Sequence, residues 1–369
     1  MWELAPDIAL ELSESLANPL SGEEIMIESL EEEDFSLIHA LQLRPRATWT
    51  QLAAALDSSP VTLARRWERL RDGGAAWVTA YPHVPGLYQV QAAYVEIRCA
   101  SGQVRELIRE LSTWSSVASI EEASREYSLV LTVFGLGLRD LSALLLDAIP
   151  SLPGVLNTRS HLASRLHVEG SSWRVGALDR RRVQALSQLP AIGGGRMATL
   201  QPWEEPYAPL TSALGEDGRH SAADLARITG RPVSTVRRQL GRLLNADALT
   251  FRCEIAQGLT PSPVVVNWWC QVPVAHVSTC VDRLRANPAV RQMASLPGPA
   301  NLLVTTWTRS IEESMRMQEH LEQDLAPLSV VDSALILRTV KRMGWLLDDV
   351  GRSTGFVVTM PAPAREETS

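Results

Sequence analysis

The spacing of hydrophobic residues changes along the chain in an order that occurs twice. Over residues 34–76, apolar side chains recur every three or four positions, which predicts three short helices. The third of these helices carries Leu63, Trp67 and Leu70 on one side. From residue 91 the apolar period becomes two, as in strands, and two amphipathic helical stretches interrupt it. The pattern over residues 91–168 therefore predicts βαββαβ, the ferredoxin-like order of elements.

The second half of the chain repeats this pattern at a constant offset of 173 residues. Residues of the first copy recur in the second, where Thr62, Arg65, Arg69 and Leu70 return as Thr235, Arg238, Arg242 and Leu243. A constant offset indicates one ancestral unit that was duplicated and fused. Solenoid repeats have periods of roughly 20–50 residues, so this much longer repeat has room for two small domains.

The expected fold class is α+β, with two winged or helix-turn-helix three-helix modules alternating with two ferredoxin-like βαββαβ domains. In these domains the second helices are expected over 138–149 and 310–325, and the linker between the copies is expected to hold a helix over 178–189. The expected boundaries are an acidic N-terminal arm at 1–33, a first helical module with a connecting strand at 34–90, a first ferredoxin-like domain at 91–168, a linker at 169–206, a second helical module at 207–262, a second ferredoxin-like domain at 263–351 and a tail at 352–369.

Charge is distributed unevenly along the chain. The net charge is −7, but residues 1–33 hold ten acidic and no basic residues, so the remainder carries a net charge of +3. Among the 35 basic residues only Lys341 is a lysine. Arginine suits contacts to phosphate and guanine, although a GC-rich genome explains the same composition. The sum of charges therefore does not exclude a nucleic-acid partner.

Composition and motifs restrict the other classes of function. The four cysteines show no CxxC spacing, no signal-peptide pattern opens the chain, and no apolar run approaches the roughly 18 residues of a membrane helix. These features predict a cytoplasmic protein with no membrane partner. No phosphate-binding loop, zinc-spaced Cys/His set or GxSxG elbow is present, so we expect no catalytic residues, no metal and no cofactor.

Three further positions have ordinary interpretations. His161 and His167 could share one strand face, but such histidines are expected to be surface residues. Trp268 and Trp269 are neighbours on a strand and must point to opposite faces. At least one of the two tryptophans is expected to pack at a sheet interface.

Both third helices carry arginines away from their buried side. Ser59 and Pro60 supply an N-cap and a proline at the first helical position. A basic helix of this kind is typical of helix-turn-helix modules, with an ordinary three-helix domain as the alternative. The predicted DNA-contacting residues are Ser59, Thr62, Arg65, Arg66, Arg69, Ser234, Thr235, Arg237, Arg238 and Arg242.

Three helices followed by βαββαβ, present twice, resemble the Lrp/AsnC family of bacterial transcription regulators. The matching stretches are Ser58-Ser59-Pro-Val-Thr-Leu-Ala-Arg-Arg-Trp-Glu-Arg-Leu, Val233-Ser-Thr-Val-Arg-Arg-Gln-Leu-Gly-Arg-Leu, and Pro153-Gly154-Val155 before a strand. The resemblance covers roughly residues 34–168 and 207–350. It implies RAM-type sensor domains that self-associate through their sheets and hold an amino acid or another small metabolite.

Two stretches depart from the family pattern at the effector site. The family often has a glycine beside an aromatic residue and an aspartate before the third strand, where this chain has Glu126-Tyr127-Ser128 and Pro299-Ala300-Asn301. Loops after that strand are the remaining candidates, although plain strand-to-helix turns would explain them. The candidate effector-binding residues are Gly135, Gly137, Thr306, Thr308 and Arg309.

The leading hypothesis is a sequence-specific transcription regulator that binds double-stranded DNA, responds to a small effector and is not an enzyme. Its two sensor domains are expected to pair within one chain, with pairing between different chains as the alternative. Its acidic arm is expected to lower DNA affinity by repelling phosphates or occupying arginines, with an inert solvating tail as the alternative. An alternative is a haem-pathway decarboxylase of the siroheme type, which is similar to this family in fold. Such an enzyme implies degenerate recognition helices and a histidine-bearing pocket. A metabolite-binding protein without DNA function is the third possibility.

Overall fold

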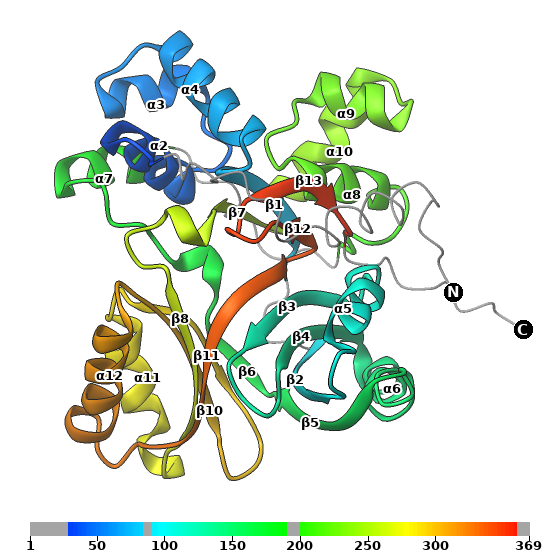
Figure 1. Ribbon diagram of the computed structural model, residues 1–369. Helices are drawn as coiled ribbons and strands as arrows, with labels where there is room; N and C mark the ends of the chain where they lie inside the picture. The colour runs from blue at the N-terminus through cyan, green and yellow to red at the C-terminus, as the bar shows by residue number, and fades with distance from the viewer. Residues whose placement is uncertain (1–28, 84–89, 190–199, 360–369) are drawn as a thin grey trace, which may run out of the picture. The chain divides into compact units, whose positions relative to one another are not determined.

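The computed structural model describes residues 29–83, 90–189 and 200–359 (Figure 1). Contacts divide these residues into two compact units. The helical unit (29–83, 171–189 and 200–256) contains both three-helix modules, and the sheet unit (90–170 and 257–358) contains both ferredoxin-like domains. The predicted α+β class is confirmed, and each unit is built from both halves of the chain.

The first module of the helical unit consists of three helices, α2 (Glu32–Leu43), α3 (Trp49–Leu56) and α4 (Pro60–Asp72). The predicted cap of α4 is present, because the Oγ atom of Ser59 accepts the backbone N–H of Thr62 at 3.0 Å. The inward side of α4 also matches the sequence pattern. Its buried residues are Leu63, Trp67 and Leu70.

The second module repeats this arrangement with α8 (Ala208–Glu216), α9 (Ala222–Thr229) and α10 (Val233–Asn245). Its core includes Leu210, Leu214, Leu225, Val236, Leu240 and Leu243. The apolar side chain of Ile228 is 42% exposed, because it lies on the last turn of the short helix α9. The linker helix is present as α7 (Arg180–Ser187), which packs against α2 and α3.

A two-stranded antiparallel ribbon joins the modules, formed by β1 (Ala76–Pro82) and β7 (Leu249–Ile255). Thr79 pairs with Arg252, the residue at the same position of the second repeat. Two arginines share this symmetry: Arg46 donates to two carbonyls of the second module, and its counterpart Arg219 donates to two carbonyls of the first. The four acceptors are Gly218, His220, Pro45 and Ala47. The two modules are therefore related by a local two-fold axis.

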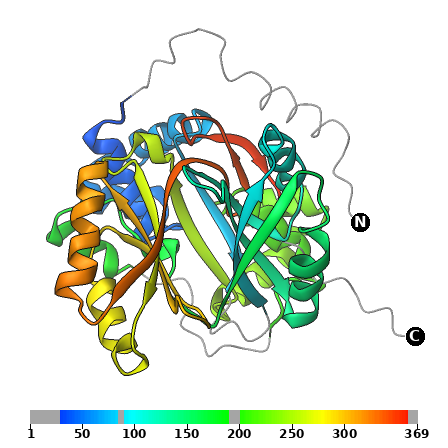
Figure 2. The same ribbon diagram turned by 60° about the horizontal axis from the view of Figure 1, so that its bottom comes forward.

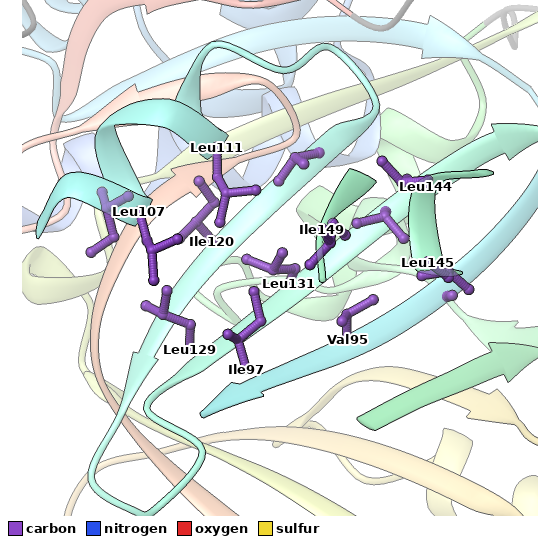
Figure 3. Close-up of a cluster of buried hydrophobic side chains, with 14 of the residues drawn as sticks. Val95, Ile97, Leu107, Leu111, Ile120, Leu129, Leu131, Leu144, Leu145 and Ile149 are labelled. Atoms are coloured by element: carbon purple, nitrogen blue, oxygen red, sulfur yellow. The ribbon is translucent and has the colours of Figure 1, made fainter. Parts of the chain in front are cut away.

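In the sheet unit, the first domain has the predicted βαββαβ order. Its elements are β2 (Val90–Cys99), α5 (Val104–Ser112), β3 (Val117–Ala123), β4 (Leu129–Leu136), α6 (Gly137–Ser142) and β5 (Val155–Ala163). Helix α6 continues as a π-helical turn over Ala143–Ala148, so the predicted helix over 138–149 exists with altered hydrogen bonding. Side chains from both helices and the strands form one apolar cluster, in which Leu107, Leu131 and Leu145 lie together (Figure 3).

The second domain has the same order of elements. These are β8 (Val264–Gln271), α11 (Val277–Arg285), β9 (Val290–Ser295), β10 (Leu302–Thr308), α12 (Ile311–Glu319) and β11 (Ser329–Arg342). The predicted helix over 310–325 ends in a π-helical turn at His320–Asp324, as its counterpart does. Figure 2 shows α11 and α12, in yellow and orange, along the outer side of the strands of this domain. The other side of these strands faces the first domain.

The two domains share one antiparallel sheet, in the order β5-β2-β4-β3-β11-β8-β10-β9-β6. A short strand that the sequence pattern did not predict, β6 (Arg165–Val168), pairs with β9 of the second domain. The equivalent edge of the first domain, β3, pairs with the last strand of the second domain, β11. Only Ser164 separates β5 from β6, so one continuous stretch of chain carries both ends of the sheet. The sheet therefore curls back on itself around an interior that both repeats line.

The segment expected as a tail from residue 352 begins with a strand, which corrects that prediction. Strand β12 (Trp345–Leu347) pairs with the end of β11, and β13 (Ser353–Val357) pairs with β12. Gly344 makes the turn possible, since its φ of +87° favours glycine and an added Cβ would lie 2.4 Å from the carbonyl oxygen of Val358. Over the described residues, no helix is both long and apolar enough to cross a membrane.

Candidate functional site

A buried carboxylate, Glu96 on β2, lies at the centre of a charged cluster in the sheet unit. It has no exposed surface. The Nε2 atom of His161 on β5 lies 2.9 Å from its Oε2 atom, and Arg125 donates to its Oε1 atom. In the register of β2 and β5, Tyr94 is opposite His161 and Glu96 is opposite Arg159. Directly opposed residues share one face of an antiparallel pair, so these side chains point to the same side.

Arg125 lies between β3 and β4 and makes most of the contacts in the cluster. Its Nη1 and Nη2 atoms donate to the two carboxylate oxygens of Asp332 on β11, at 3.1 and 3.0 Å. Arg159 donates to the same carboxylate at 3.2 Å and lies 3.6 Å from Glu96. Burial lowers the pKa of Arg159, but Glu96 and Asp332 oppose this effect and hold it above its usual value. Two guanidinium groups are thus held between two carboxylates.

Aromatic rings line the cluster on two sides. The guanidinium carbon of Arg125 lies 5.1 Å from the ring centroid of Trp269, and the ring of His161 lies 5.9 Å from the same indole. Arg159 lies 4.5 Å from the ring centroid of Tyr127. These distances are in the range of cation–π contacts. The prediction that Trp268 and Trp269 point to opposite faces agrees with their surroundings, since Trp268 lies in the apolar core of its domain.

The exposed fraction of the side chains increases from the Glu96 side of the cluster to the Arg159–Asp332 side. The side chains of Arg125 and His161 are 14% and 15% exposed, whereas those of Arg159 and Asp332 are 45% and 39% exposed. A solute can therefore reach the Arg159–Asp332 side directly, while Glu96 remains shielded. The imidazole lies between these extremes.

The cluster combines positions that are equivalent in the two repeats. Arg159 and Asp332 are 173 residues apart on the last strands of the two domains, and Glu96 and Trp269 have the same separation on the first strands. Equivalent positions carried the same residue in an ancestor that paired with its own copy. Here one repeat supplies a charged group and the other supplies its partner, so the cluster needs both halves of the chain.

The chemistry available at this cluster is carboxylate binding and proton transfer. Guanidinium groups bind carboxylates through parallel N–H donors. An imidazole that is held against a buried carboxylate keeps a fixed orientation and can donate or accept a proton. In the described parts of the chain, no three His, Cys, Asp or Glu side chains are grouped as ligands for a metal ion.

A second polar set joins the two repeats inside the sheet unit. Asn267 on β8 donates to Glu121 on β3 at 3.0 Å, and Thr305 on β10 donates to Asn267 at 2.6 Å. Gln292 on β9 donates to the hydroxyl of Tyr94 on β2. Burial raises the pKa of Glu121, although its hydrogen bond to Asn267 opposes the shift. The hydrogen bonds from Asn267 to Glu121 and from Gln292 to Tyr94 thus link the first domain to the second.

The residues predicted to contact DNA from α4 have intramolecular partners. Arg66 donates to Asp34 and Glu31 at 2.7 and 2.8 Å, and Arg69 donates to Asp34. Asp34 is fully buried, and Ser59 and Thr62 serve the cap of the helix. Arg65 is exposed. Two of the three arginines predicted to contact DNA from this helix are therefore neutralised within the module.

The corresponding surface of α10 differs. Arg237, Arg238 and Arg242 are exposed, and within the described segments none of them forms an ion pair or a side-chain hydrogen bond. Tyr207 stands where Asp34 is found in the first repeat, so the second module lacks the buried carboxylate. Ser234 and Thr235 lie on the first turn of the helix. DNA contact by either helix stays a prediction.

The candidate effector-binding residues have local structural roles. A Cβ atom at Gly135 would lie 2.9 Å from the backbone nitrogen of Leu141, and Gly137 has a φ of +80°. Thr306 accepts the indole N–H of Trp268, and Thr308 shares a hydrogen bond with Ser314. Arg309 is exposed and pairs with Glu313. Effector binding at these positions remains untested.

Sequence reasoning did not identify the charged cluster, and the expectation that His161 is an ordinary surface residue is wrong. One signal was available, since Glu96 interrupts an apolar run between Val95 and Ile97. The remaining members of the cluster come from a turn and from strands of both repeats. No local pattern brings such residues together, because their proximity depends on the pairing of the domains.

Comparisons with known proteins relate the chain to two kinds of protein. Residues 92–173 match the family model of the Lrp/AsnC ligand binding domain. No curated protein shows a match. The first domain therefore carries a ligand-binding domain of the Lrp/AsnC type.

Solved structures match over different shares of the chain. The siroheme decarboxylase NirDL, in complex with an iron-uroporphyrin III analogue, is 14% identical, with a TM-score of 0.53; the match covers 86% of this chain and 94% of that chain. A second structure of NirDL is 13% identical with a TM-score of 0.52, covering 84% of this chain and 93% of that chain. AsnC of E. coli is 18% identical, with a TM-score of 0.31, and covers 37% of this chain and 93% of that chain.

The prediction that the protein is not an enzyme is contradicted by these comparisons. Two structures that resemble it over more than four-fifths of its length are those of a decarboxylase. At these identities the likeness to NirDL shows a common fold.

Proposed function

We propose that the protein is a decarboxylase that acts on an iron tetrapyrrole of the siroheme type. The observation that carries this proposal is the buried His161–Glu96 pair beside Arg125 and Arg159. Similarity in fold to siroheme decarboxylase NirDL over 86% of the chain supports it. The cluster also supplies the histidine that the sequence alternative required.

Four residues of the cluster have roles in such a reaction. Arg125 and Arg159 hold the carboxylate that will be lost, because their donors match its two oxygens. The bond between this carboxylate carbon and the neighbouring side-chain carbon breaks, and carbon dioxide leaves. The electron pair that remains on the side-chain carbon takes a proton from His161. Glu96 orients the imidazole and stabilises its protonated form, which solvent restores from the exposed side.

The test is anaerobic incubation of the purified protein with siroheme, with mass spectrometry of the tetrapyrrole and measurement of released carbon dioxide. Loss of a general acid costs about 10²–10⁴-fold in rate, so we expect His161→Gln to lower turnover by this factor and to leave tetrapyrrole binding in place. The matched control is His320→Gln, an exposed histidine paired with Asp324. Absence of carboxyl loss with the unaltered protein would reject the proposal.

A second candidate, a regulator that binds double-stranded DNA, is favoured by the exposed arginines of α10. We propose for this case that Arg237, Arg238 and Arg242 contact DNA and that an amino acid or similar effector controls binding. The match of residues 92–173 to the Lrp/AsnC ligand binding domain supports the effector. Loss of one arginine–guanine pair costs about 1–3 kcal/mol of discrimination.

Selection of binding sites from random duplexes tests this candidate. We expect an enriched sequence, and we expect Arg237→Ala with Arg238→Ala to abolish the enrichment. The matched control is Arg283→Ala, an arginine of the sheet unit that bonds the carbonyl of Asp324. Recovery of no preferred sequence with the unaltered protein would exclude sequence-specific DNA binding.

A further inference from the structure

We propose that Arg125 and Arg159 form a binding site for an external carboxylate and that Asp332 fills this site until the external group displaces it. The identity of the natural ligand, an acidic side chain of a tetrapyrrole, rests on the proposed decarboxylase function. The existence of the site rests on the geometry alone. Asp332 then sets the affinity of the site by competing with the ligand.

The first argument is the way in which Asp332 is held. Arg125 binds both of its oxygens, at 3.1 and 3.0 Å, and Arg159 binds one of them at 3.2 Å. This is the paired-donor geometry by which arginine recognises carboxylates in general. At 39% exposure the Asp332 side chain is open to solvent, so it can leave the arginines and become hydrated.

The second argument is the backbone beside Asp332. The pairing of β11 with β8 shifts register between Val330 and Asp332, so Val331 is an extra residue in the strand. Val331 is 53% exposed. Bulges of this kind redirect side chains and occur beside functional sites. The bulge leaves Val331 without a partner on β8 and precedes Asp332, which pairs with Trp269 and directs its carboxylate to the arginines.

The third argument is charge balance. Two guanidinium groups face two carboxylates, and one of these, Glu96, is fully buried and also bonded to His161. An external carboxylate that replaces Asp332 keeps the charges of the cluster equal, whereas replacement of Glu96 would remove the partner of the imidazole. Asp332 is therefore the exchangeable member of the pair.

The experiment measures whether formate occupies the place of the Asp332 carboxylate. Asp332→Ala removes a group of the size and charge of formate, so we expect sodium formate to raise the melting temperature of this variant saturably. Binding should be about ten-fold tighter than in the unaltered protein, a difference of one decade in Kd. Sodium chloride at equal ionic strength serves as the salt control.

Two control variants identify the site. Glu313→Ala removes the partner of Arg309, a single arginine that is 75% exposed, and should show no formate response. Arg159→Gln in the Asp332→Ala background should abolish the response. Asp332→Asn, which keeps the size of the side chain, provides a second measurement: we expect it to bind iron uroporphyrin about ten-fold more tightly than the unaltered protein.

The outcomes separate this inference from the proposed function. A formate response confined to Asp332→Ala supports the site, even where siroheme is neither bound nor decarboxylated. Equal responses in the unaltered protein, Asp332→Ala and Glu313→Ala would overturn it, even where siroheme is turned over. Should Asp332→Ala fail to fold, absence of a saturable formate response in Asp332→Asn would overturn it.

Discussion

At the scale of single residues, the one lysine of the chain is buried at a joint between the repeats. Lys341 on β11 has no exposed surface, and its Nζ atom donates to the carbonyls of Ser112 and Trp114 at 2.9 and 2.8 Å. These carbonyls lie at and just beyond the end of α5, where a helix presents unpaired acceptors. Lys341 thus ties the last strand of the second domain to the first domain, and burial lowers its pKa to about 7.

This lowered pKa predicts that stability rises with pH. Between pH 7 and the unfolded lysine value near 10.5, the unfolded chain binds a proton that the folded chain does not, so unfolding becomes less favourable as pH increases. The slope is at most about 1.4 kcal/mol per pH unit for one group. Lys341→Met should lack this contribution. Urea unfolding of both proteins from pH 6.5 to 9.5 measures it, and parallel pH dependences would contradict the assignment.

At the scale of elements, α4 and α10, the third helices of the two modules, differ in the charged groups that surround their arginines. In the first module Asp34 is buried, yet its pKa is lowered: burial raises the pKa, but hydrogen bonds from Arg66, the backbone of Glu31 and Arg69 outweigh that effect. The second module has no such carboxylate, and its arginines remain exposed. Residues 1–28 of the predicted acidic arm lie outside the described residues. Glu31, which also belongs to this arm, forms an ion pair with Arg66 of α4.

Asp34→Asn should therefore expose the arginines of α4. We expect tighter binding to random duplex DNA at low salt, with a salt slope that is steeper by about 1–2, since each phosphate contact adds roughly 0.9. The variant should also lose about 1–3 kcal/mol of stability, the usual cost of removing a buried hydrogen-bonding partner. Glu33→Gln, an exposed carboxylate of the same helix, is the control. Equal DNA affinity in all three proteins would show that these ion pairs do not limit binding.

The same scale shows how far sequence reasoning reaches. Elements with a clear apolar period were predicted close to their observed bounds, such as the linker helix expected over 178–189 and observed as α7, because their buried faces are encoded locally. Strands β6 and β13 were not predicted, since they are short and owe their order to pairing partners. The charged cluster was missed for a related reason: Glu96, Arg125 and Asp332 meet only after strands of both repeats have paired.

At the scale of the whole molecule, two domains with the same order of elements pair through side chains that differ. The two joints of the sheet, β3 with β11 and β9 with β6, are equivalent in topology. The side chains across them are not equivalent, because Arg338 pairs with Glu122 at one joint and Arg165 is opposite Ser295 at the other. Two identical domains paired in this way would place the same side chains at both joints. Divergence at the joints therefore favours pairing within one chain.

Pairing within one chain predicts that thermal stability does not depend on protein concentration. When association between chains stabilises a fold, the melting temperature rises with concentration by mass action. We expect melting of the sheet unit to be unchanged over about a hundred-fold range of concentration. Mixing Arg159→Asp with Asp332→Arg should likewise give no recovery of stability, because each chain contains only one half of the exchanged pair. The double variant, which restores an opposite-charge pair within one chain, should be more stable than either single variant. A concentration-dependent melting temperature, or recovery on mixing, would instead indicate that the domains pair between chains.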